Sequence, residues 1–69
     1  HIPLGKYRHF KGKEYALLYI AYHSETLKPM AVYRQLYGEG AIWVRPLSMF
    51  LEEVRCEQGM VPRFTYIGK

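Results

Sequence analysis

Residues 30–45, MAVYRQLYGEGAIWVR, contain two runs of aromatic and aliphatic residues on either side of a turn at Gly38-Glu39-Gly40. Aromatic and β-branched residues favour strands, and a short glycine-containing connection between two such runs is typical of a β-hairpin. We therefore expect strands over Met30–Tyr37 and Ala41–Arg45. Pro46 should end the second strand, because its ring nitrogen cannot donate a hydrogen bond to the ladder.

Side chains alternate between the two faces of a strand, so the second run divides into two sets. Ile42 and Val44 share one face, while Trp43 and Arg45 share the other. If the aliphatic face forms the core, Trp43 and Arg45 point outward. A one-residue shift in register would instead bury the aromatic residues and expose the aliphatic ones.

The same alternation in the first run places Tyr33, Gln35 and Tyr37 outward beside the tryptophan, and Val32 and Leu36 inward. Arg34 then lies on the inner face, where a charged group is costly to bury without a partner. It must reach the end of the barrel or pair with a carboxylate.

Turn signals elsewhere in the chain are closely spaced and indicate a meandering all-β sheet. The further strands that we expect are Tyr7–Phe10, Tyr15–Tyr22 and Arg63–Ile67, with one short helical turn at Leu47–Leu51 that plugs the end of a small barrel. The prediction is thus a partly open barrel of about five short strands.

The composition indicates a single globular domain that spans residues 1–69, with 49% apolar residues and a net charge of +4. Cys56 is the single cysteine, so it forms no internal disulfide, and a reducing cytoplasmic location is expected. No apolar run approaches the roughly 18 residues of a membrane span, so no membrane contact is expected.

A basic cluster lies near the start of the chain. Lys6, Arg8, Lys11 and Lys13 fall within eight residues of one another, and such a cluster favours contact with polyanions. The alternative is a solvated basic strand and turn, which is the more common origin of this pattern.

The order of motifs resembles a family of small bacterial proteins known as domain of unknown function sixteen-fifty-three. The matching residues are Gly5-x-Tyr7-x-His9-Phe10-Lys11-Gly12, Ile20-Ala21-x-His23-Ser24-Glu25-Thr26, Val32-Tyr33-Arg34-x-Leu36-Tyr37-Gly38, Trp43-Val44-Arg45-Pro46-x-x-Met49-Phe50-x-Glu52 and Pro62-Arg63-Phe64. The resemblance implies a small SH3-like β-barrel, in agreement with the strand count. It implies no activity, because the family has none established.

The stretch Tyr22–Pro29, YHSETLKP, places a histidine beside a serine and a glutamate. Neighbouring residues of an extended chain point to opposite faces, so His23 cannot readily take the proton of Ser24 as a nucleophilic pair would require. The hydroxyls of Ser24 and Thr26 are better explained as turn residues that bond nearby backbone amides. We expect a polar turn and no catalysis, and no cofactor is predicted.

A metal site remains as an alternative function. His23 and Glu25 can share a face, and His9 would join them if the first strand pairs nearby, which would give ligands suited to zinc. The opposing interpretation is that both histidines are half-buried and hydrogen-bonded within the barrel.

The outward aromatic and arginine residues predict a non-catalytic binding module. Trp, Tyr and Arg concentrate binding energy at protein interfaces, and their π faces and guanidinium groups also bind nucleic acids. The candidate binding residues are Tyr33, Trp43, Arg45, Arg34 and Tyr37, with His23 and Glu25 on the rim, and Tyr7, Arg8 and Arg63 as further contributors. A protein or peptide partner is the first prediction, nucleic acid is the alternative, and exposed edge strands suggest a homodimer.

Overall fold

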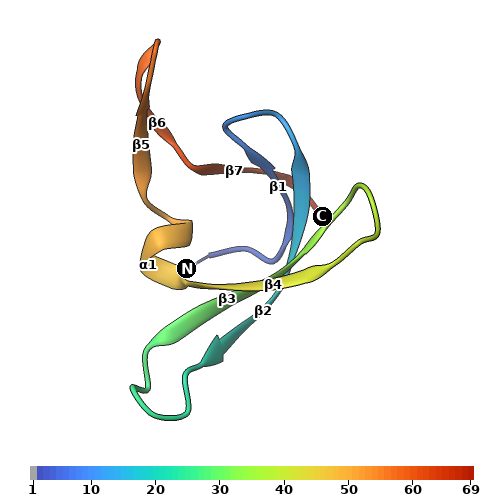
Figure 1. Cartoon of the computed structure of the whole chain (residues 1–69), viewed down its shortest axis with the longest axis vertical. Coiled ribbons are helices and arrows are strands. Elements are labelled where there is room, and N and C mark those ends of the chain that lie inside the picture. The colour runs from blue at the N-terminus through green and yellow to red at the C-terminus, as the bar shows by residue number, and fades with distance from the viewer. Residues whose placement is uncertain (1) are drawn as a thin grey trace.

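The computed structural model describes residues 2–69 and consists of strands with one helical turn (Figure 1). The strands are β1 (Gly5–His9), β2 (Glu14–Tyr22), β3 (Pro29–Gln35), β4 (Ile42–Pro46), β5 (Glu53–Cys56), β6 (Gly59–Pro62) and β7 (Phe64–Gly68), and the helix is α1 (Leu47–Phe50). Within this part of the chain no helix is long or apolar enough to cross a membrane.

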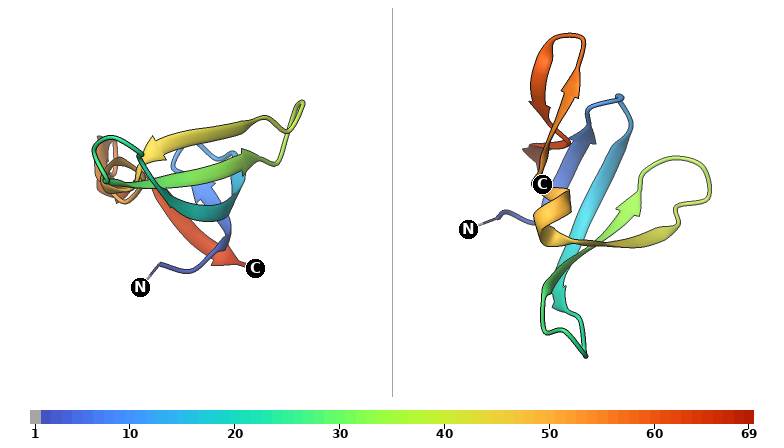
Figure 2. Two further views of the ribbon diagram at one scale, coloured as in Figure 1. Left: turned by 90° about the horizontal axis from the view of Figure 1, so that it is seen from below. Right: turned by 60° about the vertical axis from the view of Figure 1, so that its left-hand side comes forward.

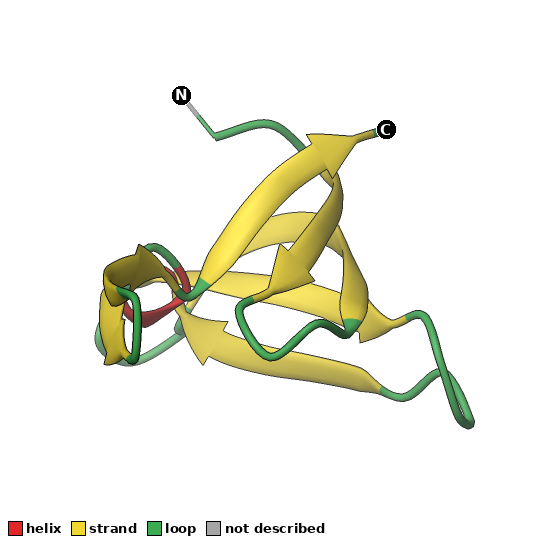
Figure 3. Cartoon of the chain, turned by 90° about the horizontal axis from the view of Figure 1, so that it is seen from above, coloured by secondary structure: helices red, strands yellow, loops and turns green. Residues whose placement is uncertain are grey.

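Five strands form one antiparallel sheet in the order β4-β3-β2-β1-β7. The sheet bends strongly, so that β7 and β4 face each other across its concave side without pairing (Figure 3). Helix α1 follows β4 directly and covers one end of the concave side (Figure 2). The predicted all-β class, with a five-stranded, partly open barrel and one short helical turn, is confirmed.

The remaining two strands, β5 and β6, form a separate hairpin that projects from the bent sheet (Figure 1). These two strands are not among those expected from the sequence. The turn depends on Gly59, whose φ of +105° is readily adopted only by glycine. Val54 and Val61 lie opposite each other in the hairpin and are partly buried.

The core is mainly aromatic. Its buried residues are Tyr7, Leu17, Ala31, Tyr33, Phe50 and Phe64. At its centre the rings of Phe50 and Phe64 stack with centroids 4.1 Å apart and an interplanar angle of 9°. Tyr33 contacts both phenylalanines, with ring centroids 5.4 Å and 5.6 Å away, so residues from β3, α1 and β7 meet in one cluster.

This aromatic core overturns the predicted register of β3 and β4. Tyr33 is only 5% exposed and faces inward, whereas Ile42 and Val44 are 52% and 60% exposed on the convex face. Because Tyr33 lies opposite Trp43, the strand β4 also turns its tryptophan to the concave side. The prediction that the aliphatic face forms the core was wrong, since aromatic rings fill the space between β3, α1 and β7 instead.

Three single-residue predictions change with the register. Val32 is only partly buried on the convex face, and Leu36, also predicted inward, is 42% exposed. Arg34 lies opposite Ala16 and Ile42 on the convex face, where it is exposed to solvent. It therefore needs neither a carboxylate partner nor the end of the barrel.

We predict that Phe50→Ala largely unfolds the domain. Truncating a buried phenylalanine costs about 3–5 kcal/mol, and a chain of this size has about 3–5 kcal/mol of stability in total. Urea unfolding followed by circular dichroism measures the loss. Ser48→Ala, an exposed position in the same helical turn, is the control and should stay within about 0.5 kcal/mol of the wild type. A Phe50→Ala variant as stable as Ser48→Ala would contradict the central role of the ring stack.

Candidate functional site

A pocket of about 210 Å³ lies on the concave side of the sheet, where β2, β3 and β4 run side by side. It is lined by Tyr15, Tyr33, Gln35, Tyr37, Trp43 and Arg45. Tyr15 lies opposite Gln35, and Tyr33 lies opposite Trp43, so alternate positions on three adjacent strands supply most of the lining. We call this set the β4 pocket.

The indole of Trp43 is fixed by a short chain of hydrogen bonds. Its Nε1–H donates to Oε1 of Gln35 at 2.7 Å, and Nε2 of Gln35 donates to the carbonyl oxygen of Tyr37 at 3.4 Å. The indole N–H therefore already has a partner, while the tryptophan remains 51% exposed. An exposed indole held in one orientation can contact a ligand at little further cost in side-chain entropy.

Two phenols form the opposite wall of the pocket. The hydroxyls of Tyr15 and Tyr37 are 2.6 Å apart and hydrogen-bonded, and the ammonium of Lys13 lies 4.5 Å from the centroid of the Tyr37 ring. Burial, together with the hydrogen bond to Tyr37, raises the pKa of Tyr15 to about 12. Tyr15 is therefore neutral at physiological pH.

Arg45 is the charged group of the pocket. It lies opposite Ala31, whose small buried side chain leaves room for the guanidinium on the concave side. Its Nε donates to the hydroxyl of Tyr33 at 3.2 Å, which leaves the edge formed by the two Nη groups without a protein hydrogen bond within residues 2–69. The ion pairs in this range are Arg8–Glu14 and Arg63–Glu52, and Arg45 belongs to neither.

Other positive charges lie close to this region. His9 has a lowered pKa, first because it is buried and then because the charges of Arg63, Arg45 and Lys11 disfavour the imidazolium. The Nδ1 of His9 accepts a hydrogen bond from the backbone N–H of Lys11 at 3.2 Å. The charges of Arg63, Arg45 and Lys11 therefore lie near His9 on this part of the concave side.

The structure brings together some of the residues predicted to bind and separates others. Tyr33, Tyr37, Trp43 and Arg45 share the β4 pocket, as their grouping on one face predicted, but that face is concave. Arg34 lies on the opposite face of the sheet. His23 and Glu25 lie in the β2–β3 turn, beyond the other end of β2.

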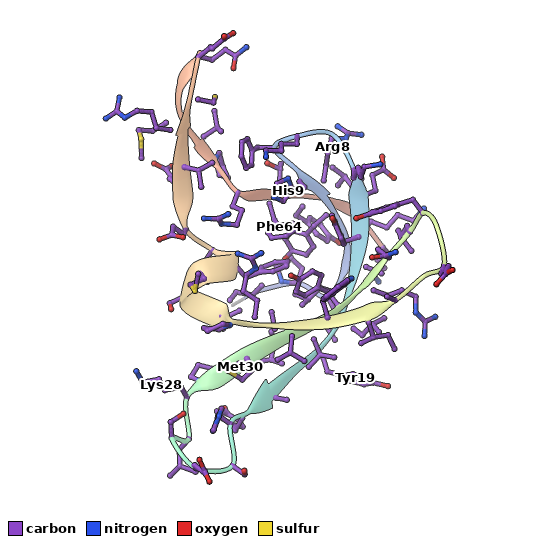
Figure 4. The ribbon with its side chains drawn as sticks, viewed as in Figure 1. Arg8, His9, Tyr19, Lys28, Met30 and Phe64 are labelled. Atoms are coloured by element: carbon purple, nitrogen blue, oxygen red, sulfur yellow. The ribbon has the colours of Figure 1, made fainter. Side chains whose placement is uncertain are left out.

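This arrangement also overturns the metal alternative. His9 ends β1 near the start of β2, whereas His23 follows the far end of that nine-residue strand. Figure 4 shows the same separation, with His9 near the centre of the molecule and Lys28, which closes the β2–β3 turn, at the lower left. Within residues 2–69 no three metal-binding side chains converge.

The β2–β3 turn is a polar turn, as predicted, but His23 and Thr26 hold its backbone amides, and no such hydrogen bond is formed by the Ser24 hydroxyl within residues 2–69. The Nδ1 of His23 accepts hydrogen bonds from the backbone N–H groups of Glu25 and Thr26 at 3.1 Å and 3.2 Å. The hydroxyl of Thr26 accepts one from the backbone N–H of Lys28 at 3.3 Å. His23 is exposed, so the prediction of a half-buried histidine was wrong for this residue.

Two residues that line the pocket, Tyr15 and Gln35, are not among the binding residues predicted from the sequence. The alternation of β3 places Gln35 on the same face as Tyr33, but its role as a hydrogen-bond partner of Trp43 depends on the pairing of β3 with β4. Tyr15 begins an apolar run, Tyr15–Tyr22, in which no alternation distinguishes one face. Only its pairing with Gln35 places it in the pocket.

A larger cleft of about 360 Å³ lies between the β5–β6 hairpin and the β1–β2 turn. Its lining is Arg8, His9, Phe10, Gly12, Cys56, Gln58, Val61, Pro62 and Thr65. The guanidinium of Arg8 pairs with Glu14 at 3.3 Å, and the thiol of Cys56 donates to Gln58 at 3.1 Å. Arg8 is paired with a carboxylate, whereas Arg45 belongs to no ion pair within residues 2–69, so the β4 pocket is the better candidate for ligand recognition.

Comparison with known proteins places the chain in a family. A family model described as protein of unknown function (DUF1653) matches residues 5–66. The chain belongs to this family. A crystal structure of a DUF1653 protein from Bordetella bronchiseptica is similar to it, with 36% sequence identity and a TM-score of 0.90 over 97% of this chain and 88% of that chain. No curated protein matches the chain.

We predict that Tyr37→Phe lowers the pKa of Tyr15 while leaving it above 10. The substitution removes the hydrogen bond to the phenol but retains burial, which is the larger cause of the raised pKa. NMR titration of the tyrosine Cζ signals measures the pKa, and Tyr66→Phe, outside the pocket, is the control. An unchanged pKa of Tyr15 in Tyr37→Phe would contradict the hydrogen bond.

The same shift has a consequence for stability. The pKa of Tyr15 is higher in the folded state than the ordinary value of 10.0, so its stabilising effect is complete below pH 10. That effect is lost as the pH rises from about 10 to about 12, because the unfolded chain ionises first. The loss over this window should be smaller in Tyr37→Phe than in the wild type.

Proposed function

We propose that this DUF1653 protein is a non-catalytic binding module that recognises a peptide segment of a partner protein through the β4 pocket. The observation that carries the proposal is that two binding groups lie in the same pocket. The indole of Trp43 is half-exposed and held by a hydrogen bond, and the Nη edge of Arg45 has no protein partner within residues 2–69. Tryptophan and arginine are the residues that most often dominate binding energy at protein interfaces.

The chemistry of the pocket supports binding without catalysis. Among its lining residues there is no carboxylate, imidazole or thiol that would act as a general base or nucleophile near neutral pH. The phenol of Tyr15, with a pKa of about 12, also stays protonated. We place the module in the bacterial cytoplasm, where the free thiol of Cys56 would remain reduced.

The distribution of basic residues favours a peptide over a nucleic acid. Lys6 and Arg8 alternate with the buried Tyr7 on β1, so they face away from the concave side, while Lys13 contacts Tyr37. The basic cluster of the sequence is therefore divided between two faces. Binding to single-stranded nucleic acid relies on a continuous basic groove with a series of stacking rings.

We predict that the domain selects peptides from a displayed random library and that Trp43→Ala or Arg45→Ala weakens the selected peptides about 30-fold. Such a loss corresponds to about 2 kcal/mol, the usual threshold for a binding hot spot. Arg34→Gln, at an exposed position on the convex face of β3, is the matched control. Affinity is measured by calorimetry, with circular dichroism to confirm folding.

Selected peptides that bind all three variants with wild-type affinity would contradict the proposal. So would a domain that selects no peptide but binds short single-stranded DNA or RNA at physiological salt. Nucleic-acid binding would also weaken steeply with rising salt, whereas peptide binding through one arginine should depend on salt only weakly.

A further inference from the structure

Strand β4 is a terminal strand of the five-stranded sheet, with β3 on one side only. Its pairing with β3 shows no register shift, so β4 is regular along its length. Ile42, Trp43 and Val44 are each more than half exposed. Within residues 2–69 no strand pairs with β4 on its other side.

The register identifies the backbone groups that point away from β3. The backbone N–H of Gln35 donates to the carbonyl of Ala41 at 3.0 Å. Bonded pairs alternate in an antiparallel ladder, so Trp43 and Arg45 are the residues of β4 that bond to β3. The N–H and C=O groups of Ile42 and Val44, and the C=O of Pro46, therefore face the free side.

This edge carries few of the features that normally prevent strand addition. Proteins protect exposed edges with charged side chains, bulges or proline, and among the residues that present free backbone groups β4 has only Pro46 at its end. The other edge strand, β7, differs, because its pairing with β1 contains a register shift between Lys6 and Tyr7. A regular, accessible edge next to a pocket is the arrangement used to bind an extended peptide as an added strand.

The register of such an added strand would fix which of its side chains lie beside Arg45 and Trp43 of the β4 pocket. Residues opposite Trp43 and Arg45 would form the non-hydrogen-bonded pairs, in which side chains are closest and lie on the same face. In an antiparallel strand the residue opposite Arg45 precedes the residue opposite Trp43 by two positions. Those two side chains would both point to the concave side.

The charges determine which side chain belongs opposite Arg45. Its Nη edge presents two parallel N–H donors, the geometry that binds a carboxylate through two hydrogen bonds. Lys13 adds a second positive charge at the pocket wall. Glu14 is paired with Arg8, and Glu52 is paired with Arg63.

We infer that the ligand is an extended segment that adds to the free edge of β4 as an antiparallel strand. A carboxylate side chain of the ligand binds Arg45, and an aromatic or apolar side chain two residues later in the ligand contacts Trp43. The inference rests on the proposed function and specifies the class of peptide and its mode of binding. The recognised pattern is acidic, any residue, aromatic. About five ligand residues span the edge from Pro46 to Ile42.

The test uses the capped pentapeptide Thr-Glu-Thr-Phe-Thr, in NMR titrations of the ¹⁵N-labelled domain. Binding should shift the amide signals of Ile42 and Val44, whose N–H groups gain acceptors. N-methylation of the central threonine, which lies opposite Val44, removes a ladder hydrogen bond and should weaken binding at least tenfold. N-methylation of the glutamate is the matched control, since that N–H points away from β4.

The carboxylate is tested by a double-mutant cycle. Replacing glutamate by glutamine in the peptide should weaken binding to the wild type about tenfold, as expected for a charge-assisted pair. In Arg45→Gln the two peptides should bind equally. The cycle isolates the interaction because each change removes the same ion pair.

Each contrary result has a distinct meaning. If the peptides bind and depend on Trp43 but tolerate central N-methylation and the change to glutamine, the inference is overturned and the proposed function stands. If neither the pentapeptide nor any library peptide binds, both are overturned. If the Ile42 and Val44 signals change with protein concentration alone, the edge pairs with a second copy of the chain and the inference is also overturned.

Discussion

The stacking of Phe50 on Phe64 is the contact on which the rest of the structure depends. Phe50 belongs to α1, which directly follows one edge strand, β4, and Phe64 belongs to the other edge strand, β7. Their stacking therefore connects the two edges of the bent sheet. Tyr33 packs against both rings and so determines which face of β3 is buried. Strand β4 pairs in register with β3, and its alternate residues Trp43 and Arg45 must then face the same side. The candidate site is thus a consequence of the core.

The sheet is curved but not closed, and the opening has a functional consequence. A closed barrel would pair β4 on both sides and leave no backbone groups available for an added strand. Here α1 covers one end of the concave side, and the same side of the sheet carries the pocket lined by Trp43, Arg45 and the hydrogen-bonded phenols of Tyr15 and Tyr37. A small domain with few buried residues thereby retains an accessible polar pocket beside an accessible strand edge.

Much of this arrangement could be predicted from the sequence. Turn residues and β-branched runs indicated the five strands of the main sheet, and period-two alternation correctly grouped Tyr33 with Trp43 and Arg45. The choice of face was wrong because aliphatic residues were assumed to form the core. The position of Arg34 argues for the observed register. If Ile42 and Val44 were buried, the charge of Arg34 would lie inside the barrel, whereas the observed register exposes it. The β5–β6 hairpin was missed because Glu53–Pro62 contains no aromatic residue, and the metal hypothesis failed because a nine-residue strand separates His9 from His23.

Trp43 is the single tryptophan of the chain, so its fluorescence reports on the β4 pocket alone. The most direct measurement is therefore a titration of a library-selected peptide, free of tryptophan, followed by tryptophan emission and by calorimetry in parallel. If the pocket is the binding site, the half-exposed indole is covered by the ligand, and its emission shifts to shorter wavelength with the dissociation constant given by calorimetry. Heat of binding that saturates without any change in the Trp43 emission would contradict the account.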